Sequence, residues 1–185
     1  MISDKENIKT SKFLSLVLRH QPELIGLELD KNGWADVDEL IKKARKHGIK
    51  LDFSILQYIV DTNIKKRFSF SDNLNGIRAS QGHSIEVDLG YVAQVPPEIL
   101  YHGTATQNVE SILQSGIEKR ERQHVHLSYD VETAIKVGQR HGKAFIFEVH
   151  AGQMYNNNFQ FYISENGVWL TDNVPVKYLK QSKSL

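Results

Sequence analysis

Arg67-Phe68-Ser69-Phe70 is followed by a polar turn over residues 72–76 and then by Ile77-Arg78-Ala79. The alternation of apolar and polar side chains on either side of the turn predicts a β-hairpin. Because successive side chains of a strand point to opposite faces, Arg67 and Ser69 should face away from Phe68 and Phe70. Helical patterns precede this hairpin, and helices followed by a hairpin suggest a winged-helix module.

The helices expected before the hairpin are marked by capping residues and by apolar side chains at helical spacing. Their predicted starts are Thr10 or Ser11 for the first helix, Asp36 with Glu39 in a capping-box position for the second, and Asp52 for the third. The first helix should end near His20. Winged-helix modules bind nucleic acid or mediate protein contacts, so the pattern alone leaves both functions open.

Val95-Pro96-Pro97 marks the expected boundary between two lobes, because consecutive prolines continue neither a helix nor a central strand. We assign residues 1–95 to an N-terminal lobe and 96–185 to a C-terminal lobe, in an α+β chain. The second lobe should contain helices at 109–115 and 131–137, a loop at 155–158, and strands at 99–102, 125–127, 144–150, 168–170 and 176–179. Trp169 is expected in the core, because its neighbours indicate a buried strand.

Composition excludes several classes of protein. The chain has 185 residues, of which 40% are hydrophobic and 24% are charged, as in ordinary globular proteins. It contains no cysteine, which excludes disulfides and thiolate metal sites, and no apolar run or export signal is evident. We therefore expect a cytoplasmic protein without a membrane segment. The net charge is +1, so any contact with nucleic acid should depend on a few placed cations.

Common nucleotide and metal motifs are missing from the sequence. There is no P-loop and no Gly-rich dinucleotide fingerprint after a strand. His124-x-His126 would place two rings on one strand face, and His20, His83 or His102 could join them. No metal-ligand spacing supports such a site, so we expect no metal.

Several basic groups have two interpretations each. Arg19-His20 falls in the last turn of the first helix, where the helix dipole favours a cation. Arg67 follows two lysines at the hairpin, and Arg120 and Arg122 lie among acidic residues. These cations could bind an anionic substrate or could simply be solvated surface charges, and the local pattern does not separate the two.

The second lobe carries short motifs in a recognisable order. Tyr101-His102-Gly103-Thr104 should follow a strand, where the glycine would let backbone groups approach a planar ligand. Ser115-Gly116-Ile117 and Val125-His126-Leu127-Ser128 come next, in the order of the diphtheria-toxin-type ADP-ribosyltransferase fold. The whole chain closely resembles the RNA 2′-phosphotransferase family (tRNA 2′-phosphotransferases). The matching segments are Ser11-Lys12-Phe13-Leu14-Ser15, Leu18-Arg19-His20, Gly33-Trp34-Ala35-Asp36, Lys66-Arg67-Phe68, Ile77-Arg78-Ala79, Gln81-Gly82-His83-Ser84, the motifs above, and Glu165-Asn166-Gly167-Val168-Trp169-Leu170-Thr171.

The resemblance implies a winged-helix RNA lobe, an ADP-ribosyltransferase-like lobe that binds NAD as a co-substrate, and an active site between them. The family's catalytic tetrad falls on Arg19, His20, Arg67 and Arg122. NAD-binding positions would be His102, Gly103, Thr104, Gly116, Ile117, His126, Ser128 and Val168. Val168 stands where related ADP-ribosyltransferases have a catalytic Glu. An RNA 2′-phosphate is already an anionic nucleophile and needs positioning more than deprotonation.

The implied reaction removes an internal 2′-phosphate from RNA, with tRNA as the expected substrate. It proceeds through RNA 2′-phospho-ADP-ribose and yields 2′-OH RNA, nicotinamide and ADP-ribose 1″,2″-cyclic phosphate. We expect a monomer that uses no metal. Two alternatives stay open: an ADP-ribosyltransferase that modifies nucleic-acid phosphates and stops there, and a non-enzymatic winged-helix nucleic-acid binder.

Overall fold

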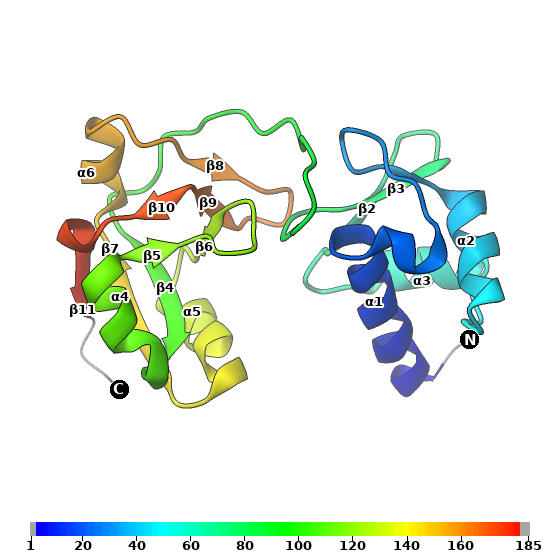
Figure 1. Cartoon of the computed structure of the whole chain (residues 1–185), viewed down its shortest axis with the longest axis horizontal. Coiled ribbons are helices and arrows are strands. Elements are labelled where there is room, and N and C mark those ends of the chain that lie inside the picture. The colour runs from blue at the N-terminus through cyan, green and yellow to red at the C-terminus, as the bar shows by residue number, and fades with distance from the viewer. Residues whose placement is uncertain (1–2, 182–185) are drawn as a thin grey trace. The chain divides into compact units, whose positions relative to one another are not determined.

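The computed structural model describes residues 3–181, and the chain divides into two compact units, Met1–Gly90 and Tyr91–Leu185 (Figure 1). Each unit has its own hydrophobic core. The division falls slightly before the expected boundary at Val95-Pro96-Pro97. The reason is that residues ahead of the prolines already contact the second unit: Gln94 N donates to Phe161 O at 2.8 Å, and the Tyr91 and Tyr162 rings are neighbours.

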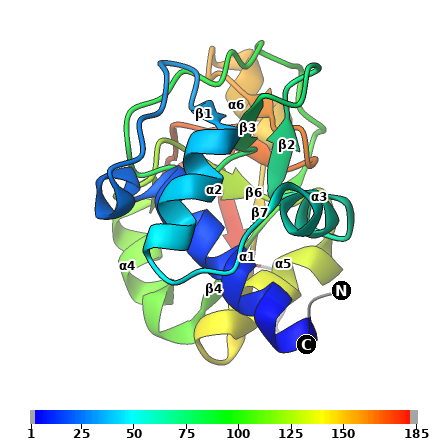
Figure 2. The ribbon, with the colours of Figure 1, turned by 90° about the vertical axis from the view of Figure 1, so that its right-hand side faces the viewer.

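The first unit combines helices with the expected hairpin. Its elements are α1 (Asp4–Arg19), η1 (Pro22–Ile25), β1 (Ala35–Asp36), α2 (Val37–Lys46), α3 (Phe53–Asp61), β2 (Phe68–Phe70) and β3 (Gly76–Ala79). The strands pair antiparallel in the order β1-β3-β2. Figure 2 turns this unit toward the viewer and shows the three helices grouped beside the hairpin. The hairpin prediction is confirmed, whereas β1 was not predicted.

One apolar core holds the helices and the hairpin together. Its fully buried side chains include Leu14, Val17, Leu18, Leu40, Ala44, Leu56, Ile59, Ile77 and Ala79. Phe68 faces this core, while Arg67 and Ser69 are only partly buried. Burial of large aliphatic side chains is the main stabilising contribution to such a unit.

Local capping residues correctly predicted the starts of two of the three α-helices in the first unit. Asp36 and Asp52 cap α2 and α3 by accepting from the N–H of Glu39 and Ile55, as predicted. The predicted start of α1 was wrong: Ser3 is the N-cap and forms a reciprocal capping box with Glu6. The proposed caps, Thr10 and Ser11, are buried inside the helix.

The second unit is built from short strands and short helices. Its elements are β4 (Leu100–Ala105), η2 (Thr106–Asn108), α4 (Val109–Ser115), β5 (Ile117–Glu118), β6 (Val125–Leu127), α5 (Val131–Gly138), η3 (Gln139–His141), β7 (Ala144–Val149), α6 (Ala151–Asn156), β8 (Tyr162–Ile163), β9 (Trp169–Thr171), β10 (Asn173–Val174), η4 (Val176–Tyr178) and β11 (Leu179–Gln181). Trp169 is buried, as predicted.

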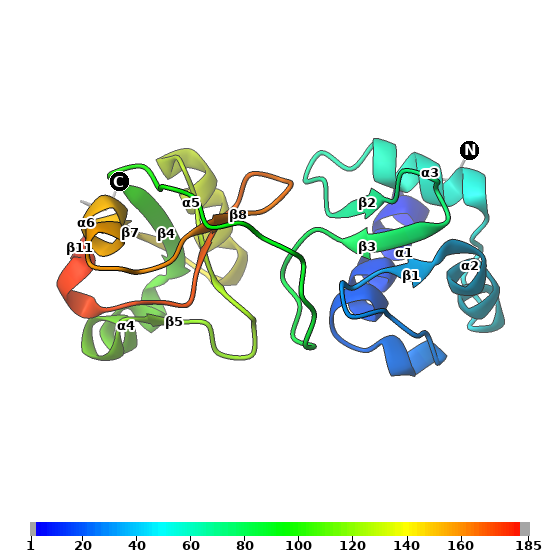
Figure 3. The ribbon, with the colours of Figure 1, turned by 90° about the horizontal axis from the view of Figure 1, so that it is seen from above.

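The strands of the second unit form antiparallel sheets in the orders β11-β7-β4, β6-β9-β8 and β10-β5. A bridge between Tyr101 and Ser128 links β4 to β6. Helix α5 packs on β4 and β7, and Figure 3 shows α5 and α4 on opposite sides of β4. The mixture of helices and antiparallel strands in both units agrees with the α+β class.

Two predictions for the second unit were wrong. Residues 151–156 form helix α6, so the first half of the predicted loop at 155–158 is helical and only residues 157–158 form a turn. The predicted strand at 176–179 begins instead as the 3₁₀ turn η4, because Pro175 precedes it and Pro175 O accepts from Tyr178 N at 3.0 Å. No helix within residues 3–181 combines the length and the apolar character that a membrane crossing needs.

Candidate active site

Arg19 and Arg67, which are far apart in the sequence, meet in the first unit. Arg19 is the last residue of α1, and Arg67 directly precedes β2. Arg19 Nη2 donates to Arg67 O at 3.3 Å, and the same oxygen accepts from Ser80 N at 2.9 Å. The end of α1 is therefore fixed to the start of the hairpin, with two guanidinium side chains at the junction.

His20 is held at the same junction by the segment that follows β3. It is the C-cap of α1, and its Nδ1 lies 2.9 Å from Ser84 Oγ. Ser84 N also donates to Arg19 O at 3.0 Å, which satisfies one carbonyl at the end of the helix. Ser84 thus positions both predicted catalytic residues of α1.

His83 lies beneath this cationic cluster. It is 1% exposed, and neither ring nitrogen has a hydrogen-bond partner within the described residues. Burial, followed by the positive charges of Arg19, His20 and Arg78, lowers the pKa of His83 to about 4. The guanidinium of Arg78 lies over the Trp34 ring at 4.5 Å from its centroid. His83 is therefore neutral at pH 7 and adds no further positive charge.

Acidification should destabilise the first unit through His83. Its folded-state pKa lies below the unfolded value of about 6.5, so the unfolded chain binds more protons between pH 6.5 and pH 4. The free energy of unfolding is highest above pH 6.5. It falls by at most about 3 kcal/mol as the pH is lowered to 4. Urea unfolding at several pH values should show this slope in the natural protein, a weaker slope in His83→Leu, and an unchanged slope in His47→Leu, which alters an exposed histidine. Equal slopes in all three proteins would contradict the assignment.

In the second unit, hydrogen bonds join His102, His126 and Arg122. His102 Nδ1 donates to His126 O at 3.2 Å, because a carbonyl only accepts. Burial lowers the pKa of His102, with a smaller lowering by Arg122, against the raising effect of its bond to His126. His102 is therefore neutral at pH 7, with Nε2 as its acceptor atom. Arg122 Nη1 donates to His126 Nδ1 at 3.2 Å, which places the proton of a neutral His126 on Nε2.

The edge of β4 offers backbone groups beside these histidines. Tyr101 N donates to Ser128 O at 2.9 Å, and Tyr101 O accepts from Ser128 N at 2.7 Å. Both backbone groups of Tyr101 therefore point away from β7. Alternation along a strand directs the N–H and C=O of Gly103 to this same edge. One position beyond the Leu127–Trp169 pair, the β6–β9 register brings Val168 opposite Ser128. The bridge from Tyr101 to Ser128 thus brings the middle of β4, which carries His102 and Gly103, next to the end of β6, and Val168 directly precedes the paired strand β9.

The glycines at predicted NAD positions have structural reasons of their own. A Cβ on Gly103 would lie 1.8 Å from Ala134 O, so α5 occupies the space that a side chain would need. A Cβ on Gly116 would lie 2.4 Å from Val174 O, and this residue has a φ of +83°. Helix packing is therefore a reason for glycine at position 103 that the sequence did not indicate, and the expectation that Gly103 lets its backbone approach a ligand stays a prediction. Its location was also predicted imperfectly, since Gly103 and Thr104 lie within β4.

The remaining predicted NAD residues lie apart from this edge or are already engaged. Thr104 is buried, and its Oγ1 accepts from Asn108 Nδ2 at 3.2 Å. Ile117 is buried and pairs with Val174, in the β5–β10 ladder. Arg19, His20 and Arg67 belong to the first unit, whereas Arg122 belongs to the second.

Sequence reasoning assigned no role to Ser80, His83 or Ser84, although they hold or surround the predicted catalytic residues. Their signal was present in the Gln81-Gly82-His83-Ser84 segment that carries part of the resemblance. The contacts themselves could not be anticipated, because they join α1 to a segment about 60 residues later.

Comparison with known proteins connects these residues to a family. The family model described as RNA 2′-phosphotransferase, Tpt1 / KptA family, matches residues 5–173. The chain belongs to this family. A relative from Flavobacterium johnsoniae is 57% identical over 95% of this chain and 97% of its own length. Another, from Fusobacterium nucleatum, is 55% identical over 94% of this chain and 98% of its own. Both carry the name "Probable RNA 2′-phosphotransferase".

Membership of the RNA 2′-phosphotransferase family confirms the resemblance drawn from the sequence and indicates a transferase that acts on RNA. The matched range includes every predicted catalytic and NAD-binding residue. It also includes the contacts of Ser84 and the Arg122–His126 bond. These interactions therefore lie within the part of the chain that the family model matches.

Proposed function

We propose that this chain removes an internal 2′-phosphate from RNA, in particular tRNA, and transfers it to NAD as the second substrate. In the first step the RNA 2′-phosphate attacks C1″ of the nicotinamide ribose, and nicotinamide leaves. In the second step O2″ of the ribose attacks phosphorus, and the RNA 2′-oxygen leaves with a proton. The products are 2′-OH RNA and ADP-ribose 1″,2″-cyclic phosphate.

The observation that carries the NAD assignment is the edge of β4 beside His102. The nicotinamide of NAD carries a carboxamide, which has one acceptor oxygen and a donor NH₂ group. These complement the N–H and C=O that Gly103 directs to this edge. His102 Nε2 supplies a neutral acceptor next to it, suited to a ribose hydroxyl. Ser128 lies across the bridge from Tyr101 and completes the nicotinamide-ribose side. Gly116 and Ile117 would serve the adenine through backbone groups.

Phosphate recognition is assigned to Arg19, Arg67 and Arg122. Guanidinium groups bind phosphate through paired N–H donors and keep their charge at all physiological pH values. The hydrogen bond from Arg19 Nη2 to Arg67 O holds the Arg19 side chain against the backbone that carries Arg67 before substrate binds. His20, fixed by Ser84, is the candidate for proton transfer to or from the reacting oxygens, since imidazole exchanges protons near neutral pH.

The proposal is tested by product identification. Purified protein is incubated with NAD and a short RNA that carries one internal 2′-phosphate and a 5′ label. We expect 2′-OH RNA, nicotinamide and ADP-ribose 1″,2″-cyclic phosphate in equal amounts, and no reaction without NAD. A stable ADP-ribosyl adduct as the end product would favour the alternative ADP-ribosyltransferase. Binding without any product would favour the non-enzymatic binder.

Turnover should not depend on a metal ion. In the proposed scheme three guanidinium groups neutralise the phosphate, and the sequence offers no thiolate or recognisable His/carboxylate ligand set. We expect the rate measured with excess EDTA to equal the rate without it. Loss of turnover on chelation, with recovery on addition of zinc or magnesium, would contradict the scheme.

A further inference from the structure

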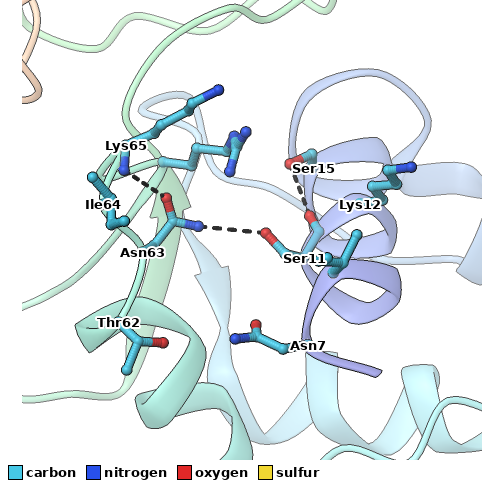
Figure 4. A pocket seen from close by; sticks show the side chains of 10 residues that line it. Asn7, Ser11, Lys12, Ser15, Thr62, Asn63, Ile64 and Lys65 are labelled. Carbon is cyan, nitrogen blue, oxygen red and sulfur yellow. Dashed lines mark hydrogen bonds between the residues drawn. The ribbon is translucent and has the colours of Figure 1, made fainter. Parts of the chain in front are cut away.

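A pocket of about 420 Å³ opens in the first unit between one face of α1 and the segment that connects α3 to β2 (Figure 4). Asn7, Ile8, Ser11, Lys12 and Ser15 line it from α1, and Thr62, Asn63, Ile64, Lys65 and Arg67 line it from the other side. Its volume lies within the range of small-ligand sites. Apart from Arg67, the proposed reaction uses none of these residues.

The charge of the pocket favours an anion. Lys12 lies on one wall, and Lys65 and Arg67 lie on the other. Among the described residues that line the pocket, none is acidic. Since the whole chain has a net charge of only +1, this gathering of cations is a local feature and not the effect of a generally basic surface.

Hydrogen bonds hold the two walls in place. Asn63 Nδ2 donates to Ser11 Oγ at 3.4 Å, and Asn63 Oδ1 accepts from Lys65 N at 3.2 Å (Figure 4). One amide therefore bridges α1 and the connecting segment. Lys66 N donates to Asn63 O at 2.7 Å, and Lys66 has a φ of +40°, which is unusual for a residue with a side chain. The surrounding contacts thus maintain a backbone turn that brings Lys65 and Arg67 to the pocket.

Two isoleucines in the lining are turned toward solvent. Ile64 is 99% exposed and Ile8 is 59% exposed, although isoleucine is among the most frequently buried residue types. Neither belongs to the core of this unit. Apolar carbon beside amide, hydroxyl and cationic groups suits a ligand that has both a charged group and a ribose or base.

We propose that this pocket binds the RNA strand next to the 2′-phosphate, with Lys12 and Lys65 contacting a backbone phosphate of a neighbouring nucleotide. The assignment rests on the proposed function, in which Arg67 contacts the 2′-phosphate itself. Because Arg67 also lines the pocket, the two sites are continuous along one strand. Ile8 and Ile64 would pack against the sugar or base of that nucleotide.

The test compares two double variants that each remove two exposed charges from the first unit. Lys12→Ala/Lys65→Ala alters the pocket, and Lys42→Ala/Lys46→Ala alters the exposed face of α2 as the control. Affinity for a single-stranded RNA hexamer with one internal 2′-phosphate is measured without NAD at several salt concentrations. Thermal unfolding of both variants should match that of the natural protein.

We expect the pocket variant to bind the hexamer about tenfold more weakly at low salt than the control variant does. Its slope of log affinity against log salt should be smaller by about 0.7, the contribution of the one backbone phosphate that the two lysines contact. A hexamer with neutral methylphosphonates at the linkages flanking the 2′-phosphate should bind both variants alike. Equal affinities and slopes for the two variants on the natural hexamer, or no binding of it by the natural protein, would overturn the pocket assignment.

Failure of the proposed function would look different. In that case the natural protein would give no 2′-OH product with NAD, whatever the pocket variant does to binding. Normal turnover by the natural protein, combined with identical RNA binding by both variants, would support the proposed reaction and contradict the pocket assignment. Weaker RNA binding by the pocket variant, combined with no turnover by the natural protein, would support the pocket assignment and contradict the proposed reaction.

Discussion

Replacing Arg122 by alanine should make RNA 2′-phospho-ADP-ribose accumulate. The second step passes through a phosphorane-like state with more negative charge on the phosphoryl oxygens than the first step develops, so loss of one donor should slow the second step more. Removal of one transition-state donor typically costs about 3 kcal/mol, or 10² to 10³ in rate. Arg122→Ala also removes the donor that fixes the His126 ring. In a time course with 5′-labelled 2′-phosphorylated RNA, the intermediate should rise above its level in the natural protein before product forms.

Arg120→Ala is the matched control for this experiment. Arg120 lies two residues away in the same exposed segment and carries the same charge. It should leave both steps unchanged. If Arg122→Ala leaves the substrate unconsumed with no intermediate at any time, Arg122 acts in substrate binding or in the first step, and our assignment of its role is wrong.

Gly103→Ala should severely destabilise the second unit. The added methyl would lie 1.8 Å from Ala134 O and within 3.1 Å of Ala134 Cα, so β4 and α5 must separate. Overpacking usually costs about 1 to 3 kcal/mol, and contact with backbone places this change at or above the upper end. We expect insoluble protein or a large fall in the midpoint of thermal unfolding.

Gly167→Ala separates this steric effect from the general cost of losing a glycine. Gly167 lies in the same unit with a φ of +77°, and nothing stands within 4 Å of its Cβ position. Alanine there should cost only about 1 to 2 kcal/mol, the penalty for a left-handed residue. Comparable losses in the two variants would show that the contact between Gly103 and α5 does not constrain the sheet.

The features that sequence predicted well are local ones. Asp36 and Asp52 each cap a helix whose first turn lies within three residues, so the signal and the structure share one short segment. Ser3 and Glu6 carry the same capping signal, but the apolar spacing of this helix begins only at Phe13, so the predicted start lay too late in the chain. The start of α1 was thus predictable in principle.

Other features depend on partners that are distant in sequence. Strands β1, β5, β8 and β10 have only two residues each, too few for a periodic pattern, and exist because of their pairing partners. In the site, motif resemblance selected Arg19, Arg67, His102 and His126 individually. It could not provide the bond from Arg19 to Arg67 O or the bond from His102 to His126 O, since both are tertiary contacts.

The links that join His102, His126 and Arg122 pass through different parts of His126. His102 bonds to its backbone carbonyl, whereas Arg122 bonds to its ring. A peptide carbonyl has no proton to hand on, so no proton can travel along this series from one imidazole to the other. Each ring therefore has its own hydrogen-bond partner: the His126 carbonyl for His102, and the Arg122 guanidinium for His126. This arrangement fixes the orientation of both rings, but the bond between the two histidines does not carry a proton from ring to ring.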